Sequence, residues 1–312
     1  MQDLAFLIVG IAVVVAATRL ALDNAIVIAQ HYRVSEFFIG VGLLAVGSDL
    51  PEVVLSLTAA LRNLGGQDTS NLIIGNAIGS AFAQFALVMG VAGMLGYLTM
   101  PRRYLQRHGV MLLASMLLLF VTGLDGRVSR VEGLVLVLTF GLYVVFLFSE
   151  EGALEKVRAR PLGNGWKVWL GLAAGLLLVV ASSELIVRSA IGLALRWDVD
   201  QSFVAIVIVG IGTSLPELVI SVGSVLKSRT AMSVGNLLGS NILDVLLPVG
   251  LASLLAPLRF DRGLLLFDLP ALFLLSVLIL IFFLRTRGLQ HREAVALLSI
   301  YAGYLLIKMI QA

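Results

Sequence analysis

The chain has 312 residues, of which 59% are hydrophobic and only 13% are charged. Soluble domains average about 45–50% apolar and about 25% charged residues, so the composition excludes an ordinary soluble protein and indicates a multi-spanning helical membrane protein. The net charge of +3 gives no reason to expect a nucleic-acid partner, and the absence of cysteine excludes disulfides and thiolate metal sites.

Ten apolar segments are long enough to cross a bilayer, because a helix needs about 20 residues to span the hydrocarbon core. In chain order they cover residues 3–30, 35–63, 69–97, 105–124, 129–149, 167–195, 200–227, 230–255, 264–285 and 290–310. The longest loop, residues 150–165, divides the spans five and five. The expected fold is therefore an all-α polytopic membrane protein with ten transmembrane helices.

The loops between the spans carry unequal positive charge. Those on one side, which include residues 150–165, hold 13 Lys and Arg residues, and those on the other side hold 7. Since Lys and Arg concentrate in cytoplasmic loops, this bias places loop 150–165 in the cytoplasm and both termini outside. We expect a multi-pass protein of the cell membrane.

The two halves of the chain match each other. The 40 residues from Thr18 align without a gap to those from Ser183, and "GNAIGSAFAQ" at 75–84 aligns to "GNLLGSNILD" at 235–244. Each half holds an odd number of spans, so the second half enters the membrane from the opposite side. Inverted repeats of this kind are typical of secondary transporters, whose substrate site lies near the midplane. The predicted organisation is a first repeat (1–149), a cytoplasmic linker (150–165) and a second repeat (166–312).

Each half contains the pattern G-[ST]-x-L-P-E within an apolar segment, at residues 47–52 and 212–217. Proline removes a backbone donor and clashes with the preceding turn, and glycine lets the backbone unwind, so both patterns predict a helix broken in mid-membrane. Freed carbonyls at that depth survive only where they are buried or line a watered cavity, where they can bind a cation. Glu52 and Glu217 follow the breaks; the alternative is that they only cap the second half-helix.

A second motif adds polar residues at the same depth. Ser80 and Gln84 in the first half, and Ser240 and Asp244 in the second, are four residues apart and so share a helix face. Together with the glutamates they form a set of oxygen donors, which is what Ca²⁺, with 6–8 oxygen ligands, and Na⁺ prefer. The alternative for the serines is simple packing or bonding to their own backbone.

The motifs resemble those of a known family. "VGIGTSLPELVISVGS" with "SVGNLLGSNILDVLLPVG", and "AVGSDLPEVVLSLTAA" with "IIGNAIGSAFAQFALVMG", resemble the two alpha-repeats of the calcium/cation antiporter superfamily, in its sodium/calcium exchanger branch. The alpha-repeats would cover about 40–90 and 205–250, and the resemblance extends over essentially the whole chain. It implies exchange of Ca²⁺ for Na⁺ across the bilayer by alternating access, with no cofactor and no obligate protein partner. The ligands it implies are Glu52 and Glu217, assisted by Ser48, Thr213, Ser80, Ser240, Asp244 and carbonyls near Ala45 and Gly210.

Two residues depart from the family pattern, both in the first half. Asp49 stands where a serine is expected, as Ser214 does in the second half, and Gln84 stands where asparagine or aspartate is common. We include all three as candidate ligands. The site would then hold four acids, which cannot all stay ionised in a low-dielectric cavity without cations. Three roles for Asp49 are open. It could favour a divalent ion or change the number of ions bound, it could take up H⁺ and make the protein a Ca²⁺/H⁺ exchanger, or it could point away from the site. Mg²⁺ is an alternative to Ca²⁺ as the transported ion.

Other functions fit the residues less well. An ion channel is disfavoured because inverted repeats with occluding carboxylates suit alternating access. An intramembrane enzyme needs a nucleophile with a base or an open metal site, but all three histidines lie near span ends, so we expect no enzyme.

Away from the centre, two pairs spaced i,i+4 are predicted to neutralise themselves, Arg19 with Asp23 and Glu184 with Arg188. Asp268 is expected to anchor the ninth span, and His108, its counterpart, to lie at the membrane interface.

Overall fold

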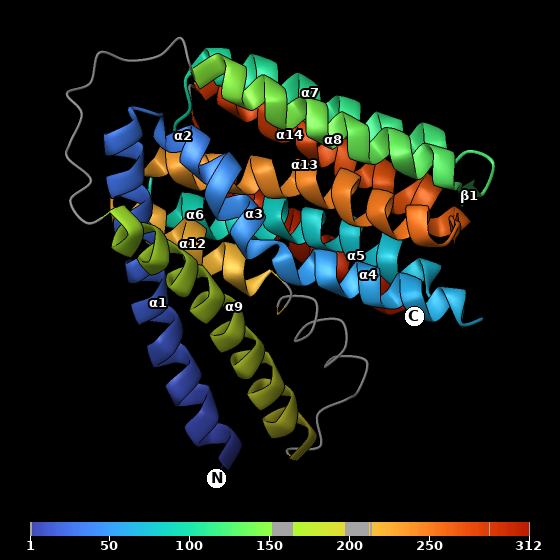
Figure 1. Ribbon diagram of the computed structural model, residues 1–312, viewed down its shortest axis with the longest axis horizontal. Helices are drawn as coiled ribbons and strands as arrows, with labels where there is room; N and C mark the ends of the chain where they lie inside the picture. Colours follow the sequence, from blue (N-terminus) through green and yellow to red (C-terminus); the bar gives the residue numbers. More distant parts are fainter. Residues whose placement is uncertain (1, 152–164, 197–211, 213, 287, 312) are drawn as a thin grey trace.

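A computed structural model describes residues 2–151, 165–196, 212, 214–286 and 288–311, and these residues are almost entirely helical (Figure 1). The longer helices are α1 (Gln2–Tyr32), α4 (Leu50–Leu64), α5 (Ser70–Ala83), α7 (Arg102–Thr122), α8 (Arg130–Glu151), α9 (Gly165–Arg196), α12 (Leu215–Leu226), α13 (Thr230–Leu255), α14 (Leu269–Thr286) and α15 (His291–Gln311). The short elements are α2 (Glu36–Ile39), α3 (Ala45–Ser48), α6 (Met89–Leu95), the π-helical turns η1 (Gly40–Leu44), η2 (Gln84–Val88) and η4 (Leu264–Asp268), and the strands β1 (Arg127–Val128) and β2 (Leu258–Arg259).

The spans agree with the sequence prediction wherever they are described. Eight helical stretches are long and apolar enough to cross a membrane, and the bent unit from Glu36 to Leu64 makes up to nine. The predicted span 200–227 is described mainly through α12, because 197–211 and 213 lie outside the described residues. A nearly all-helical protein with several apolar spans is therefore confirmed, whereas the number of ten helices stays a prediction.

Helix α13 forms the centre of the bundle. It packs against α4, α5, α7, α8 and α12, and most of its side chains are buried. Helices α1 and α9 pack along each other and lean away from the rest of the bundle (Figure 1). Large apolar side chains on the outer faces, such as Leu142 and Val145 of α8, are exposed, as expected for surfaces that face lipid.

Two glycines bring backbones into contact near the start of the broken helix. A Cβ atom added to Gly40 of η1 would lie 2.4 Å from the carbonyl oxygen of Met232, and one added to Gly235 of α13 would lie 2.5 Å from that of Phe37. Small residues permit this close approach between membrane helices, where van der Waals packing supplies much of the association energy. The approach fixes the first half of the broken helix against α13.

Short pairings tie the two halves together at opposite ends of α7. After its end, β1 pairs antiparallel with β2, with Val128 opposite Leu258. Before its start, Leu98 forms an isolated bridge with Leu289. Leu258 lies 160 positions after Leu98 and corresponds to it in the second half, and Leu289 lies 161 positions after Val128 and corresponds to that residue. The second-half residue of each pairing is therefore the counterpart of the first-half residue of the other pairing.

Two further side-chain contacts, one in each half and at corresponding positions, are buried in the bundle. The Nδ1 atom of His108 lies 3.0 Å from the Tyr143 hydroxyl, and the Tyr304 hydroxyl donates to Asp268 Oδ1 at 2.6 Å. Asp268 follows His108 by 160 positions, and Tyr304 follows Tyr143 by 161. His108 and Asp268 are both buried inside the bundle, and the position of His108 at the membrane interface stays a prediction. The expectation that Asp268 anchors its span agrees with its bonds to α15.

The Asp268 contact yields a prediction on stability. Asp268 is 1% exposed and also accepts a bond from Lys308 Nζ at 3.1 Å. Asp268→Ala leaves the Tyr304 hydroxyl and the Lys308 ammonium without their acceptor, so we expect the free energy of unfolding in detergent to fall by about 2 kcal/mol. Asp125→Ala removes an exposed carboxylate paired with Arg127 and should cost under about 0.5 kcal/mol. Equal losses in both variants would contradict this assignment.

The charged pairs on α1 and α9 differ from each other. Arg188 pairs with Glu184 at 2.5 Å within α9, as predicted. Asp23 of α1 instead accepts from Lys227 Nζ at 2.6 Å, beyond the end of α12, so its predicted pairing with Arg19 was wrong. A cation from a neighbouring helix end reaches Asp23, and the α1 pair becomes a contact between helices.

Candidate functional site

The first L-P-E pattern breaks its helix where the sequence predicts. Helix α3 ends at Ser48, α4 begins at Leu50, and the axes of the two parts differ by 43°. Asp49 lies between them with φ −85° and ψ 2°, and Pro51 occupies the first turn of α4. Since proline has no backbone N–H to donate, the helix cannot continue regularly through this point.

The second pattern has the same geometry from its third residue onward. Ser214 precedes α12 with φ −92° and ψ 11°, close to the values of Asp49. The N–H of Leu218 donates to the Ser214 carbonyl at 3.0 Å, as the N–H of Val53 donates to that of Asp49 at 3.2 Å. The candidate ligands Gly210 and Thr213 lie outside the described residues.

Three carboxyl groups converge at these breaks. One carboxylate oxygen from each of Asp49, Glu52 and Glu217 lies within 4.8 Å of the others. The three residues are at most 3% exposed. The two glutamates reach one another from opposite halves of the chain, and Asp49 points into the same space. The possibility that Asp49 points away is therefore wrong.

These carboxyl groups carry oxygens without a hydrogen-bond donor. Among the described residues, none is found for Asp49 Oδ2, Glu52 Oε2 or either carboxylate oxygen of Glu217. Burying an ionised carboxylate without a partner costs several kcal/mol, so such groups are normally paired or bound to a metal ion. Three converging carboxylates with free oxygens form a site whose charge a cation would balance.

The predicted hydroxyl and carbonyl ligands divide into two groups. Ser80, Ser240 and Ser214 are buried, and within the described part of the chain their Oγ atoms have no hydrogen-bond partner. Ser48 Oγ donates to the Ala45 carbonyl at 3.2 Å and lies 3.5 Å from Asp49 Oδ1. The Ala45 carbonyl also accepts from the Asp49 N–H at 3.0 Å, so it is engaged within its helix rather than freed by the break.

Gln84 and Asp244 meet across the two halves. Gln84 begins the π-helical turn η2, and its Nε2 donates to Asp244 Oδ2 at 2.9 Å. Asn241 Nδ2 in turn donates to Gln84 Oε1 at 2.8 Å, which fixes the orientation of the amide. Asp244 Oδ1 and Asn241 Oδ1 have no hydrogen-bond partner among the described residues. Gln84 is therefore a neutral donor that holds the fourth acid.

The structure adds polar residues that the motifs do not single out. Ser56 and Ser221 are fully buried and lie one helical turn after Glu52 and Glu217. Ser221 Oγ accepts from Asn236 Nδ2 at 3.2 Å, and no described residue bonds Ser56 Oγ. The sequence does contain a pattern that points to these two serines, since both halves place a serine four positions after the glutamate.

Known proteins resemble the chain over nearly all its length. The family described as "Sodium/calcium exchanger protein" matches residues 3–149 and 167–310. The chain belongs to the sodium/calcium exchanger family. Relatives of this family of cation antiporters include the sodium/calcium exchanger MaX1 of Methanosarcina acetivorans, 29% identical over 96% of this chain and 97% of the relative. The inner membrane protein YrbG of Escherichia coli strain K12 is 28% identical over 82% of this chain and 81% of that protein.

A solved exchanger has the same fold. The structure of the sodium-calcium exchanger NCX_Mj superposes with a TM-score of 0.83 at 25% identity, covering 97% of both chains. Membership of this family makes the chain a membrane transporter rather than a member of an enzyme class. Membership of a cation-exchanger family also agrees with a site built from carboxylates and hydroxyls, whose oxygens bind cations.

Proposed function

We propose that this protein exchanges Ca²⁺ for Na⁺ across the cell membrane by alternating access, and that both ions bind at the helix breaks near the midplane. The convergence of the Asp49, Glu52 and Glu217 carboxylates in a buried space carries this proposal. Ca²⁺ is a hard cation that takes oxygen ligands, and three carboxylates supply the charge that a divalent ion needs. The remaining ligands of the proposed site are Ser48, Ser80, Ser214, Ser240, Thr213 and Asp244, with Gln84 and the backbone near Ala45 and Gly210 around them.

The two halves are inferred to be inverted repeats, residues 1–149 and 166–312. The exchanged pairings of Leu98 with Leu289 and of Val128 with Leu258 support this inference, since they occur at opposite ends of α7. The contacts His108–Tyr143 and Asp268–Tyr304 support it from within the bundle. Inverted repeats permit alternating access because one half can move against the other around a fixed site. The positive-charge bias supports the further inference that the linker is cytoplasmic and the termini lie outside.

H⁺ is the alternative counter-ion, and Asp49 is the observation that favours it. Asp49 adds a carboxyl group within 4.8 Å of Glu52 and Glu217. Neighbouring buried carboxyl groups share protons when no cation balances them, so proton uptake could accompany Ca²⁺ release. Mg²⁺ is an alternative cargo, although it demands a stricter octahedral geometry than Ca²⁺.

Ion flux in liposomes tests the proposal. Purified protein is reconstituted into Ca²⁺-loaded vesicles, and Ca²⁺ efflux is followed under a Na⁺ gradient or a pH gradient applied separately. We expect efflux that requires external Na⁺ and stops when choline replaces it. Efflux driven by the pH gradient and indifferent to Na⁺ would establish the H⁺ alternative. Mg²⁺-loaded vesicles, run in parallel, test the alternative cargo.

A further inference from the structure

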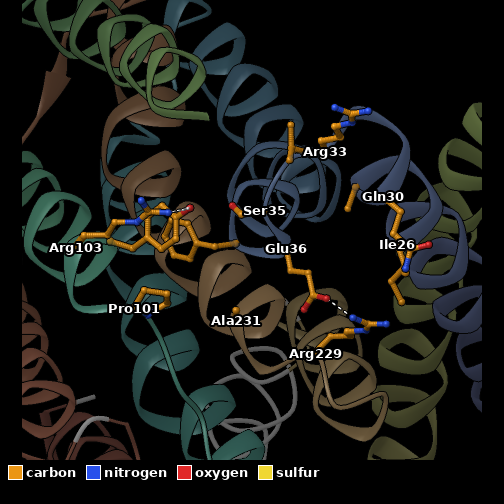
Figure 2. A pocket seen from close by; sticks show the side chains of 13 residues that line it. Ile26, Gln30, Arg33, Ser35, Glu36, Pro101, Arg103, Arg229 and Ala231 are labelled. Carbon is orange, nitrogen blue, oxygen red and sulfur yellow. Dashed lines mark hydrogen bonds and ion pairs between the residues drawn. The ribbon is translucent and has the colours of Figure 1, made fainter. Parts of the chain in front are cut away.

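A basic cavity lies at the end of the bundle away from the carboxylate site. Its volume is about 410 Å³, and the end of α1, the turn into α2 and the starts of α7 and α13 line it (Figure 2). The loops that carry Arg33, Arg103 and Arg229 at this end are among those that the positive-charge bias predicts to be cytoplasmic. The size is within the range of about 300–1,000 Å³ that is usual for small-molecule sites.

Three arginines and one glutamate line the cavity. Arg229 is paired with Glu36, as the dashed line in Figure 2 shows, so these two charges balance each other. Arg103 stacks over the Tyr104 ring at 4.8 Å and donates to the Tyr104 hydroxyl at 3.3 Å, which holds its guanidinium at the cavity wall without neutralising it. Among the described residues Arg33 forms no ion pair. Counting the described residues alone, the cavity carries two positive charges without an ion-pair partner.

The backbone of Arg33 is unusual. It has φ 58° in the turn that ends α1, where the Val34 N–H donates back to the Ala29 carbonyl at 3.1 Å. This position of a helix C-terminal turn is usually glycine, because a side chain in the left-handed region is strained. An arginine at this position places a long cationic side chain on the rim of the cavity at a conformational cost.

Two helix starts add to the positive potential. Helix α7 begins after Pro101 and α13 after Arg229, and neither residue caps its helix with a side chain. The first N–H groups of a helix have no intrahelical acceptor, and the helix dipole places partial positive charge there. Both starts line the cavity, so their dipoles reinforce the arginines.

We propose that this cavity binds the phosphate of an anionic phospholipid headgroup, with Arg33 and Arg103 as its anion-binding side chains. Cytoplasmic leaflets are rich in anionic lipids, and basic pockets between transmembrane helices at that surface suit their headgroups. Free phosphate offers the same chemistry and is separated by experiment. A bound headgroup contacts α1 together with α7 and α13, and so ties α1 to the body of the bundle.

Lipid binding to the full chain in detergent tests this proposal without reference to transport. The probes are short-chain phosphatidylglycerol, short-chain phosphatidylcholine and inorganic phosphate, each titrated with detection by native mass spectrometry. We expect phosphatidylglycerol to bind at least about ten-fold more tightly than phosphatidylcholine. Competition of inorganic phosphate with that lipid would support the anion site and make soluble phosphate a second occupant. Equal binding of the two lipids together with no binding of phosphate would overturn the proposal.

Paired substitutions locate the site. The double change Arg33→Gln with Arg103→Gln is expected to weaken phosphatidylglycerol binding by about ten-fold or more, whereas Arg33→Lys with Arg103→Lys retains most of it. The matched control is Arg285→Gln with Arg292→Gln, which removes equal charge from exposed positions outside the cavity. A loss as large in the control as in the cavity variant would show general surface attraction and overturn the assignment. Transport failure leaves this test unaffected.

Discussion

Glu52→Gln is expected to abolish Ca²⁺ transport, and Glu217→Gln to do the same from the other half of the chain. Both carboxylates are buried. One oxygen of Glu52, one of Glu217 and one of Asp49 lie within 4.8 Å of one another. A unit charge about 4 Å from another contributes about 4 kcal/mol at the effective dielectric constant of a protein, and Ca²⁺ carries two charges. The loss of one ligand charge should lower Ca²⁺ affinity by at least about 100-fold.

The measurement is Ca²⁺ binding by calorimetry together with Na⁺-driven efflux from liposomes. Glutamine preserves the shape of the side chain, so folding is expected to be retained and is checked by thermal unfolding in detergent. Glu184→Gln is the control, because Glu184 is exposed on α9 and pairs with Arg188. Its flux should stay within about two-fold of the unmodified protein, as expected for an exposed ion pair. A Glu52→Gln protein that still binds Ca²⁺ with its original affinity would remove Glu52 from the site.

The sequence predicts the fold well because the membrane imposes simple rules on it. Long apolar runs must form helices in lipid, since every backbone group needs an internal partner there. The described elements follow those runs, and the L-P-E patterns mark the first residues of α4 and α12. The convergence of Glu52 with Glu217 also follows from the pattern, because both halves place a glutamate directly after the break.

The sequence does not predict which side chains meet across the two halves. The i,i+4 spacing places Gln84 on a helix face with Ser80, and Asp244 on another face with Ser240. The hydrogen bond between Gln84 and Asp244, 160 positions apart, depends instead on how η2 packs beside α13. The Ala45 carbonyl was expected to be free, whereas a local turn with Ser48 and Asp49 engages it. Asp23 pairs with Lys227, which directly follows the end of α12, for the same reason. Such contacts depend on the rotation and depth of whole helices, which periodicity does not fix.

Asp49→Ser is expected to weaken Ca²⁺ binding by about ten- to 100-fold and to reduce the effect of pH on it. Asp49 supplies one of the three converging carboxylates, and serine is the residue at the corresponding position of the second half, Ser214. Protons and Ca²⁺ compete for the same carboxylates, so Ca²⁺ affinity falls as the pH is lowered. With one carboxylate removed, we expect about one fewer proton to be displaced per Ca²⁺ bound, as measured by calorimetry in buffers of different ionisation enthalpy. Asp49→Asn, which preserves the shape, should match Asp49→Ser if charge is the cause, and unchanged affinity in both would make Asp49 peripheral.

Asp244→Asn is the comparison that distinguishes the two acids. Gln84 already donates to Asp244 Oδ2, and the group of three carboxylates forms without Asp244. We therefore expect Asp244→Asn to cost less Ca²⁺ affinity than Asp49→Asn, although each removes one carboxylate. The reverse order would mean that Asp244 is the principal third acid and that Gln84 releases it when the ion binds. If the expected order is found, Asp49 supplies the third negative charge for Ca²⁺, and Asp244, whose carboxylate is held by Gln84, does not.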